Sequence, residues 1–238
     1  MRSRLYSVIS ILIFALLYCF TAIGVFIVLI FACLKMRKPI TFLSQMWAKS
    51  VFLIMGKKFR LTGRENIRKG EKYILVANHA SLFDIVAIVS FYPGITWFGH
   101  ERLLKVPLFG KILKMTDYVP FKEPNFRNTR SMIEQLVQKS KQQTVAIFPE
   151  GTRTLNGRIN TFYRGFIYLY RTRDLEILPV TLNGFYDLKP KNRAYINFGS
   201  KLEVIIHEPI KREVLNEKSD NEIIDTVKGI IESAYQKK

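Results

Sequence analysis

The sequence predicts an α/β fold: a mixed, largely parallel sheet flanked by helices, with an N-terminal membrane helix and a second interfacial helix in front. Residues 5–34 carry no charged side chain. From residue 59 onward, short apolar runs typical of strands alternate with longer runs typical of helices. A hydrophobic content of 48% with a net charge of +18 favours a folded protein with an anionic partner over a disordered chain. We expect membrane-anchoring helices at 1–56 and an α/β domain at 57–238.

The uncharged run at 5–34 is long enough to cross a bilayer. Thirty residues of helix extend about 45 Å, and the hydrocarbon core is about 30 Å thick. A secretory signal peptide is the alternative, because Arg2 and Arg4 precede the run, but its apolar core is usually much shorter. We interpret the run as a retained membrane helix. More Lys and Arg follow it than precede it, which favours a cytoplasmic position for the downstream domain.

Residues 42–55 mix apolar and polar side chains around Trp47 and predict a second helix. The pattern suits a helix lying in the membrane interface, and a core helix of the domain is the alternative. Basic residues follow Gly56 and are expected to face anionic lipid headgroups; they are Lys57, Lys58 and Arg60. Both cysteines, Cys19 and Cys33, lie in the apolar N-terminal run, so no disulfide framework is expected.

The remaining elements follow from apolar periodicity and turn residues. Strands are expected at Phe59–Thr62, Tyr73–Ala77, Ile95–Phe98, Tyr118–Phe121, Thr144–Phe148, Glu176–Leu182, Ala194–Phe198 and Leu202–Ile206. Helices are expected at Leu82–Phe91, Leu108–Lys114, Arg127–Gln142, Phe166–Arg173 and Asp220–Gln236. The last two strands are expected to form an antiparallel edge. Residues 151–160 are poor in apolar side chains, and we expect them to form a mobile loop.

A histidine and an aspartate follow the strand expected at 73–77. His79 stands at the strand exit, where open α/β sheets place their ligands. If Ser81 caps the next helix, Asp84 falls in its first turn and can face back toward His79. The carboxylate would then fix the imidazole tautomer and leave the other ring nitrogen free as a base. The alternative is a structural histidine with a first-turn aspartate that suits the helix dipole.

A second strand exit carries the sequence Pro149-Glu150-Gly151-Thr152-Arg153. Two polar strand exits in one α/β pattern indicate a single crevice lined from both sides. Arg153 is suited to grip a phosphate with two parallel hydrogen bonds, and a solvated surface arginine is the alternative. Glu150 would be repelled by a phosphate unless it binds hydroxyl groups or pairs with Arg153.

Together, Asn-His-x-x-x-x-Asp and Phe-Pro-Glu-Gly-Thr-Arg resemble the motifs of the glycerolipid acyltransferases, most closely the 1-acylglycerol-3-phosphate (lysophosphatidic acid) O-acyltransferases. The resemblance covers about residues 60–185. It implies transfer of a fatty acyl group from acyl-CoA or acyl-carrier protein, as co-substrate, to the sn-2 hydroxyl of lysophosphatidic acid, with no other cofactor. It implies a base at His79 oriented by Asp84, and acceptor binding by Glu150, Gly151, Thr152 and Arg153.

The chemistry expected at this crevice is direct attack of the acceptor hydroxyl on a thioester. No G-x-S-x-G motif is present, so a serine acyl-enzyme finds no support. Backbone N–H groups near Gly151 and Thr152 are candidate oxyanion donors, and Lys105 is a side-chain alternative. Lys122 stands where the resembling family usually has an arginine, so it keeps the positive charge without the fork. A different lysolipid acceptor is therefore the nearest alternative.

The remaining histidines and two other classes of protein fit the sequence less well. His100 is given no role, and His207 is expected to be solvated. The three histidines lack the spacing of a metal site, so none is expected. A nucleic-acid-binding protein would use the positive charge, but no binding motif is present. A non-catalytic adaptor at the membrane surface would leave His79 and Asp84 without a purpose. We therefore expect an anionic membrane and a lysolipid as partners, and no nucleic acid.

Overall fold

The computed structural model describes residues 2–34, 36–105, 110, 113, 118–121 and 134–236. Its centre is a seven-stranded sheet in the order β1-β7-β6-β2-β5-β3-β4. The strands are β1 (Phe59–Thr62), β2 (Tyr73–Ala77), β3 (Thr96–His100), β4 (Val119–Phe121), β5 (Val145–Ile147), β6 (Glu176–Asn183) and β7 (Leu202–Ile206). All neighbours are parallel except β6 and β7. The expected mixed, largely parallel sheet is confirmed.

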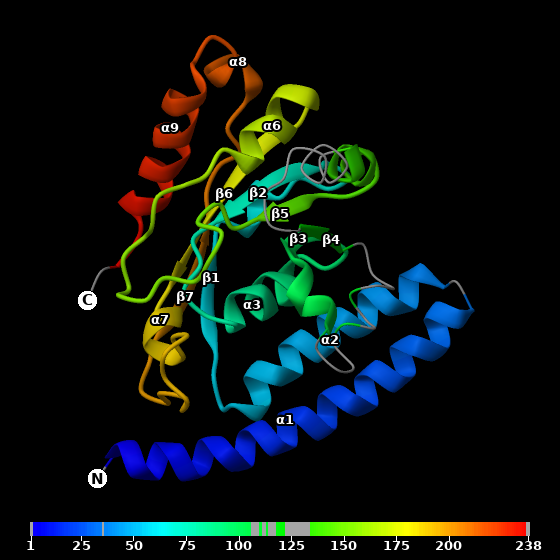
Figure 1. The fold of residues 1–238 in the computed structure, drawn as a ribbon, viewed down its shortest axis with the longest axis vertical. Coiled ribbons are helices and arrows are strands. Elements are labelled where there is room, and N and C mark those ends of the chain that lie inside the picture. The colour runs from blue at the N-terminus through cyan, green and yellow to red at the C-terminus, as the bar shows by residue number, and fades with distance from the viewer. Residues whose placement is uncertain are drawn as a thin grey trace.

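Helices cover both faces of the sheet (Figure 1). The described helices are α1 (Arg2–Cys33), α2 (Arg37–Ile54), η1 (Arg64–Asn66), α3 (Phe83–Phe91), η2 (Glu101–Lys105), α6 (Gly165–Thr172), α7 (Phe185–Leu188), α8 (Arg212–Leu215) and α9 (Asp220–Ser233). Residues 134–140 are also helical, within the helix expected at 127–142, most of whose first half lies outside the described residues. Gly110 and Leu113 are the only described residues of the helix expected at 108–114, and both are helical.

The two hydrophobic cores follow from the alternation of side chains along the central strands. Leu75 on β2 points to the face covered by α2 and α3, where it shares a core with Phe52 and Ile88. Val76, the next residue, points to the opposite face and the core formed with α6 and α9. Because both faces are covered, all five residues of β2 are buried. Burial of the strand fixes the position of its carboxyl end, where His79 follows.

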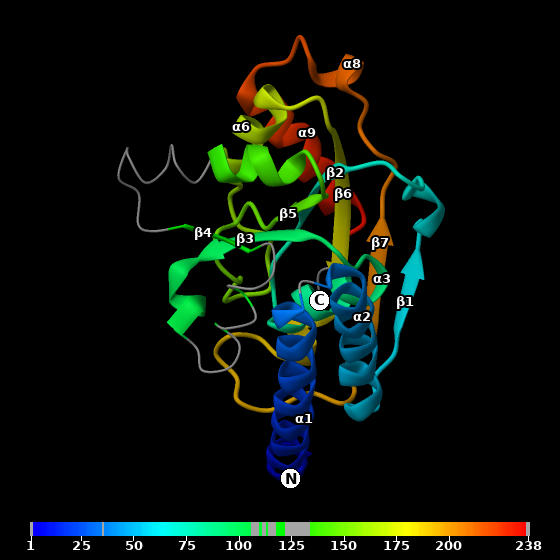
Figure 2. The same cartoon turned by 90° about the vertical axis from the view of Figure 1, so that its right-hand side faces the viewer.

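The N-terminal helices form an antiparallel pair beside one face of the sheet, as Figures 1 and 2 show. The Trp47 indole N–H on α2 donates to the Thr21 hydroxyl on α1 at 3.1 Å. At the start of α1, the Ser10 hydroxyl accepts from the Ile196 N–H at 2.9 Å. On its other side α2 buries Ala48, Val51 and Phe52, so this helix contributes to the core of the α/β unit. The proposed division between residues 56 and 57 stays a prediction.

The segment expected to be a strand at 194–198 is irregular, and that expectation is wrong. The N–H of Ile196, which a strand partner would use, instead binds Ser10 of α1. The Phe198 ring packs edge-on against Tyr6, with ring centroids 5.4 Å apart. The expected antiparallel edge is also misplaced, since β7 runs antiparallel to β6 and parallel to β1.

The position of Lys57 also differs from the expectation. It was expected to face lipid headgroups, but it is buried. Its ammonium donates to the carbonyls of Phe198 and Ser200, and burial lowers its pKa. Lys57 therefore holds the 198–200 segment against the start of β1. Lys58 remains exposed.

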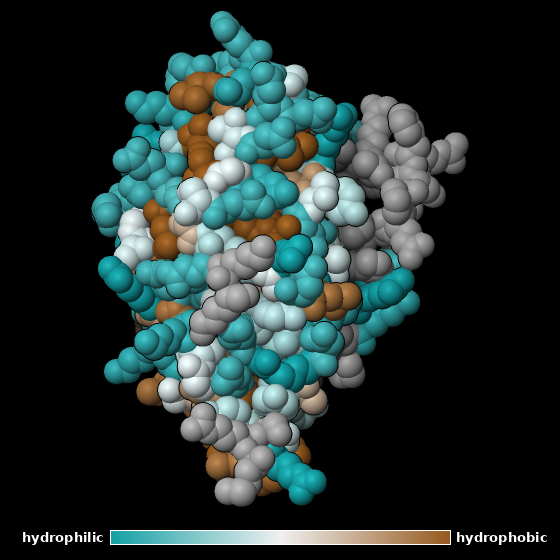
Figure 3. Space-filling view, turned by 90° about the vertical axis from the view of Figure 1, so that its left-hand side faces the viewer, coloured by the Kyte–Doolittle hydropathy of each residue, from teal (hydrophilic) through white to brown (hydrophobic). Residues whose placement is uncertain are grey.

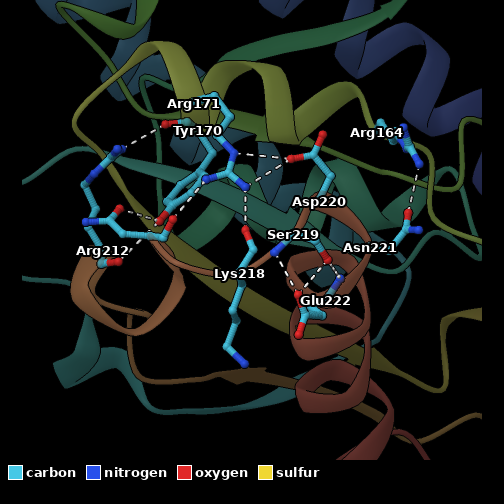
Figure 4. A network of polar contacts seen from close by, with 10 residues as sticks. Arg164, Tyr170, Arg171, Arg212, Lys218, Ser219, Asp220, Asn221 and Glu222 are labelled. Carbon is cyan, nitrogen blue, oxygen red and sulfur yellow. Dashed lines mark hydrogen bonds and ion pairs between the residues drawn. The ribbon is translucent and has the colours of Figure 1, made fainter.

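On the opposite face, α6, α8 and α9 are joined by the polar network of Figure 4. Arg171 on α6 pairs with Asp220 at the start of α9 at 3.2 Å. Ser219 and Glu222 form a reciprocal capping box at the same end of α9. These contacts lie at the far face of the sheet from α1 and α2. Beyond the other end of α9, the Tyr235 hydroxyl donates to the Gly157 carbonyl in the loop after β5.

Candidate active site

The two polar strand exits meet, as the sequence predicts. β2 and β5 are parallel neighbours, with Val76 beside Ile147, so their carboxyl ends lie side by side. At the end of β2, the Asn78 side chain replaces a strand partner. Its amide donates to the Leu182 carbonyl at 3.0 Å and accepts from the Leu182 N–H at 2.8 Å. This pairing fixes the residue before His79.

His79 and Asp84 contact each other as expected. Nδ1 of His79 lies 2.9 Å from Oδ2 of Asp84, whose side chain has no exposed surface. The same oxygen accepts from the N–H groups of Ala80 and Ser81 at 2.6 and 2.7 Å. An oxygen that already accepts two backbone N–H groups also acts as an acceptor toward His79, so His79 carries its proton on Nδ1. Among the described residues, no hydrogen bond reaches Nε2, and 15% of the side chain is exposed.

The expected cap is wrong in one detail: α3 begins at Phe83, and Leu82 rather than Ser81 occupies the cap position. The Ser81 hydroxyl donates to the Lys189 carbonyl at 2.7 Å and accepts from the Phe83 N–H at 3.4 Å. The Asp84 carboxylate accepts the N–H groups of Ala80 and Ser81, which precede the helix. An acidic side chain here also suits the positive end of the helix dipole. Asp84 therefore anchors the turn and faces His79 at the same time.

The imidazole of His79 packs against two stacked aromatic side chains, a contact that the sequence did not predict. Its ring stacks on Phe148, with centroids 4.0 Å apart and planes 14° from parallel. Phe148 in turn stacks on Trp97 of β3 at 5.7 Å. The stack and the bond to Asp84 together fix the plane of the imidazole. Phe148 belongs to the Phe-Pro-Glu-Gly-Thr-Arg stretch, so its position was visible in the sequence, but its contact with the histidine was not.

Glu150 is buried and bonded to backbone on both oxygens. Oε1 accepts from the His79 N–H at 2.6 Å, and Oε2 accepts from the Asn160 N–H at 2.8 Å. Burial raises the pKa of Glu150 from 4.5 to about 7, while the two backbone N–H donors oppose that rise. Its carboxylate therefore links the catalytic turn, its own strand exit and residue 160. Its expected role in acceptor binding stays a prediction.

The turn after β5 limits which backbone N–H groups can hold an oxyanion. Gly151 adopts φ of +66°, and its N–H donates to the Phe148 carbonyl at 3.1 Å. That bond removes Gly151 from the two expected donors. Within the described part of the chain, no acceptor contacts the Thr152 N–H, which remains a candidate. Lys105 is exposed at the end of η2, and no described contact joins it to His79. Lys122 lies outside the described residues.

The loop at 151–160 is tied at several points, although it was expected to be mobile. The Thr154 N–H donates to the His79 carbonyl at 2.9 Å. The hydroxyls of Tyr186 and Tyr235 donate to the carbonyls of Leu155 and Gly157 at 2.9 and 2.8 Å. Neither tyrosine belongs to a motif that sequence reasoning identified. Arg153 is half-buried in this loop, so it is not a fully solvated surface arginine.

The other histidines take no part in this arrangement within the described contacts. Nε2 of His207 lies 2.8 Å from the Thr181 hydroxyl, and burial lowers the pKa of its imidazole. The expectation that His207 is solvated is therefore wrong. The side chain of His100, in β3, lies outside the described residues. The described His, Cys, Asp and Glu side chains form no group of three or more that fits a metal ion.

Comparison with known proteins gives a consistent result. The solved structure of the 1-acyl-sn-glycerophosphate (LPA) acyltransferase PlsC from Thermotoga maritima matches with a TM-score of 0.80 and 26% identity, over 98% of this chain and 97% of that one. The chain is 26% identical over 196 residues to the chloroplastic 1-acyl-sn-glycerol-3-phosphate acyltransferase LPAT1 of Arabidopsis thaliana, covering 80% of this chain and 55% of that protein. It is 29% identical over 200 residues to a probable 1-acyl-sn-glycerol-3-phosphate acyltransferase of Mycoplasma pneumoniae, covering 78% and 74%.

The chain thus spans little more than half the length of the plant relative. The family model described as Acyltransferase matches residues 58–183, which is more than half of the chain. The match includes both strand exits and every site residue named from them. The chain belongs to the Acyltransferase family.

Proposed function

We propose that this protein is a membrane-bound acyltransferase that moves a fatty acyl group from acyl-CoA or acyl-carrier protein to the sn-2 hydroxyl of 1-acylglycerol-3-phosphate, giving phosphatidic acid. The observation that carries the proposal is the 2.9 Å contact between His79 Nδ1 and the buried Asp84 carboxylate. It makes Nε2 a base at the exit of a central strand. No cofactor beyond the acyl donor is needed for this reaction.

In the proposed reaction, Nε2 of His79 takes the proton of the acceptor hydroxyl as its oxygen attacks the thioester carbonyl. The carbonyl oxygen becomes negatively charged, and the Thr152 N–H is the backbone group available to receive it. The tetrahedral intermediate then collapses, the carbon–sulfur bond breaks, and the proton held on His79 passes to the departing thiolate. Asp84 stabilises the imidazolium between these two steps.

Arg153 is proposed to hold the acceptor by its phosphate. It lies one residue before Thr154, whose N–H donates to the His79 carbonyl. A guanidinium so placed can bind the phosphate through two parallel hydrogen bonds and leave the acceptor hydroxyl near Nε2. The expected roles of Lys105 and Lys122 stay predictions.

Membrane attachment is proposed from α1. One described helix segment, Arg4–Cys33, is long and apolar enough to cross a bilayer, and 17% of its apolar window is buried inside the protein. A core helix would be mostly buried. The face of α1 that the protein leaves uncovered is apolar from end to end, and it carries Leu5, Val8, Ile11, Leu12, Leu16, Ile23, Phe26 and Ile30. We propose that this face contacts hydrocarbon, with the catalytic unit on the cytoplasmic side and basic residues near anionic headgroups. Figure 3 shows a mainly hydrophilic face of the molecule, with separate hydrophobic patches over its upper half and at the lower end, where α1 begins.

The test is acyl transfer by the purified protein, given acyl-CoA or acyl-carrier protein and a panel of lysolipids, with products identified by mass spectrometry. Phosphatidic acid is expected from lysophosphatidic acid. His79→Ala should lower turnover about 10²–10⁴-fold, the usual contribution of a general base, while thermal unfolding stays near wild type. A folded His79→Ala protein with near-normal turnover would refute the assigned base. Preferential acylation of a different lysolipid would replace the proposed acceptor.

A further inference from the structure

A loop far from both motifs lies against the catalytic turn. The Ser81 hydroxyl, two residues after His79, donates to the Lys189 carbonyl at 2.7 Å. Lys189 directly follows α7, and its N–H donates to the Phe185 carbonyl at 3.1 Å. The carbonyl of Leu188 accepts from the Asn197 N–H at 2.9 Å. The backbone at residue 189 is therefore held on both sides, at a fixed place beside His79.

Positive charges gather at this place. The ammonium of Lys189 is half-buried, and burial lowers its pKa, with further lowering by the nearby guanidinium groups of Arg153 and Arg193. Arg193 is tied down: it donates to the carbonyl of Asp187 and lies over the Tyr195 ring at 5.0 Å. No described acceptor binds Arg153, and Lys189 donates to the carbonyl of Pro190 at 3.2 Å. Lys189 is bonded to Ser81, two residues after His79, and Arg153 precedes Thr154, whose N–H donates to the His79 carbonyl, so both side chains start from backbone beside His79. Two cations at one place repel, and a bound anion relieves that repulsion.

We propose that Lys189 is a specificity-determining residue that binds the acceptor's phosphate together with Arg153. The pair selects a phosphomonoester over a phosphodiester headgroup. This inference rests on the proposed function, because it concerns the acceptor of that reaction. A phosphomonoester carries about 1.5 to 2 negative charges near neutral pH, whereas a phosphodiester carries one. Arg153 supplies a planar fork and Lys189 a compact point charge, so together they match the monoester in charge and in number of donors.

The test compares Lys189→Met with Lys191→Met. Lys191 lies two residues along the same loop and is exposed, so the control makes the same charge change outside the cluster. Lys189→Met should raise KM for lysophosphatidic acid about tenfold to a hundredfold, the usual worth of a charged hydrogen bond, with kcat within about threefold of wild type. KM for lysophosphatidylglycerol, a phosphodiester, should change far less. Lys189→Arg should restore most of the affinity, and Lys191→Met should match wild type.

A second source of the same chemistry is the 3′-phosphate of coenzyme A, which is also a phosphomonoester. KM is therefore measured separately for acyl-CoA. A rise in the acyl-CoA value without a rise for lysophosphatidic acid would overturn the proposal. So would an equal rise for both lysolipids, an equal effect of Lys191→Met, or a fall in kcat at constant KM, since each result shows that Lys189 does not read the acceptor's phosphate.

A binding measurement separates this inference from the proposed function. Lysophosphatidic acid is titrated calorimetrically, in detergent micelles, into His79→Ala protein with and without Lys189→Met. Weaker binding in the double variant supports the role of Lys189 even if wild-type protein transfers no acyl group, in which case only the proposed function fails. Equal binding by the two variants overturns the role of Lys189 whether or not wild-type protein is active.

Discussion

Replacing Asp84 by Asn tests how the buried carboxylate acts on His79. Oδ2 accepts three N–H groups, from His79, Ala80 and Ser81, while Oδ1 is buried without a hydrogen-bond partner among the described residues. The Asn amide therefore has one tolerable orientation. Its oxygen must take the place of Oδ2, because an NH₂ group there would face three donors. His79 then keeps its proton on Nδ1, and Nε2 remains a base.

The expected loss of activity comes from the missing negative charge. A hydrogen bond to a charged group contributes about 1.5–3 kcal/mol and a neutral one about 0.5–1.5 kcal/mol. Replacing the carboxylate by an amide should therefore cost about 1–2 kcal/mol in the transition state, where His79 is an imidazolium. An upper bound is the attraction of two unit charges at about 4 Å, about 4 kcal/mol at an effective dielectric constant of 20. At about 1.36 kcal/mol per decade, turnover should fall about 10-fold to 10³-fold. A wrong tautomer would cost about 10⁴-fold.

The assay is single-turnover acyl transfer by wild type, Asp84→Asn, His79→Ala and the double variant. Because Asp84 acts through His79, adding Asp84→Asn to His79→Ala should change turnover little. The NH₂ group left in the place of Oδ1 should also cost about 1–3 kcal/mol in the free energy of unfolding, measured by urea denaturation. A loss below about threefold, a loss above about 10⁴-fold, or an undiminished effect of Asp84→Asn in the His79→Ala background would refute this account.

Three further predictions concern other parts of the molecule. Arg153→Ala should weaken acyl transfer to lysophosphatidic acid at least tenfold more than it weakens hydrolysis of the acyl donor by water, because its guanidinium is proposed to bind only the acceptor; equal losses in the two assays would contradict that role. The double variant Ile11→Glu/Leu12→Glu, at exposed positions of α1, should be released from lipid vesicles in a flotation assay, whereas Val214→Glu on α8 should stay bound. Equal flotation of wild type, the double variant and Val214→Glu would exclude α1 as the anchor. For Glu150, whose pKa is raised from 4.5 to about 7, the folded state holds more protons than the unfolded state between these values, so wild-type stability should fall as pH rises through this window. Glu150→Gln should lack that slope in thermal unfolding between pH 4.5 and 8, and an identical slope in both proteins would show that another group titrates.

The elements that local sequence determines were predicted well. The bounds expected for β1, β2 and β7 agree with the structure, because each is a short apolar run bordered by polar or turn-forming residues. Residues 194–198 carry a similar local signal and form no strand. Their partners are Ser10 and Tyr6, almost two hundred residues earlier in the chain. A local pattern holds no information about which distant segment will accept a backbone N–H.

In the candidate site, too, the local contact was predicted and the contacts with distant segments were not. His79 was predicted to face Asp84 if it lies just outside the helix and Asp84 falls in the first turn, and their contact is confirmed. The residues that hold them were not predicted. Lys189 and Tyr235 reach the site from segments without a recognisable motif, through bonds to Ser81 and Gly157. Their roles depend on how the C-terminal third of the chain returns to the strand exits.

The polar groups of the site fall into two kinds, those bonded to backbone and those without a described partner. Both oxygens of Glu150 and Oδ2 of Asp84 accept backbone N–H groups, so these side chains hold the two strand exits as one unit. No described partner contacts Nε2 of His79, the Thr152 N–H or the guanidinium of Arg153. A base, an oxyanion donor and a phosphate ligand are the three groups that acyl transfer to a phosphorylated alcohol requires. The polar groups of this turn thus either fix its geometry or are open to the roles proposed for them in acyl transfer.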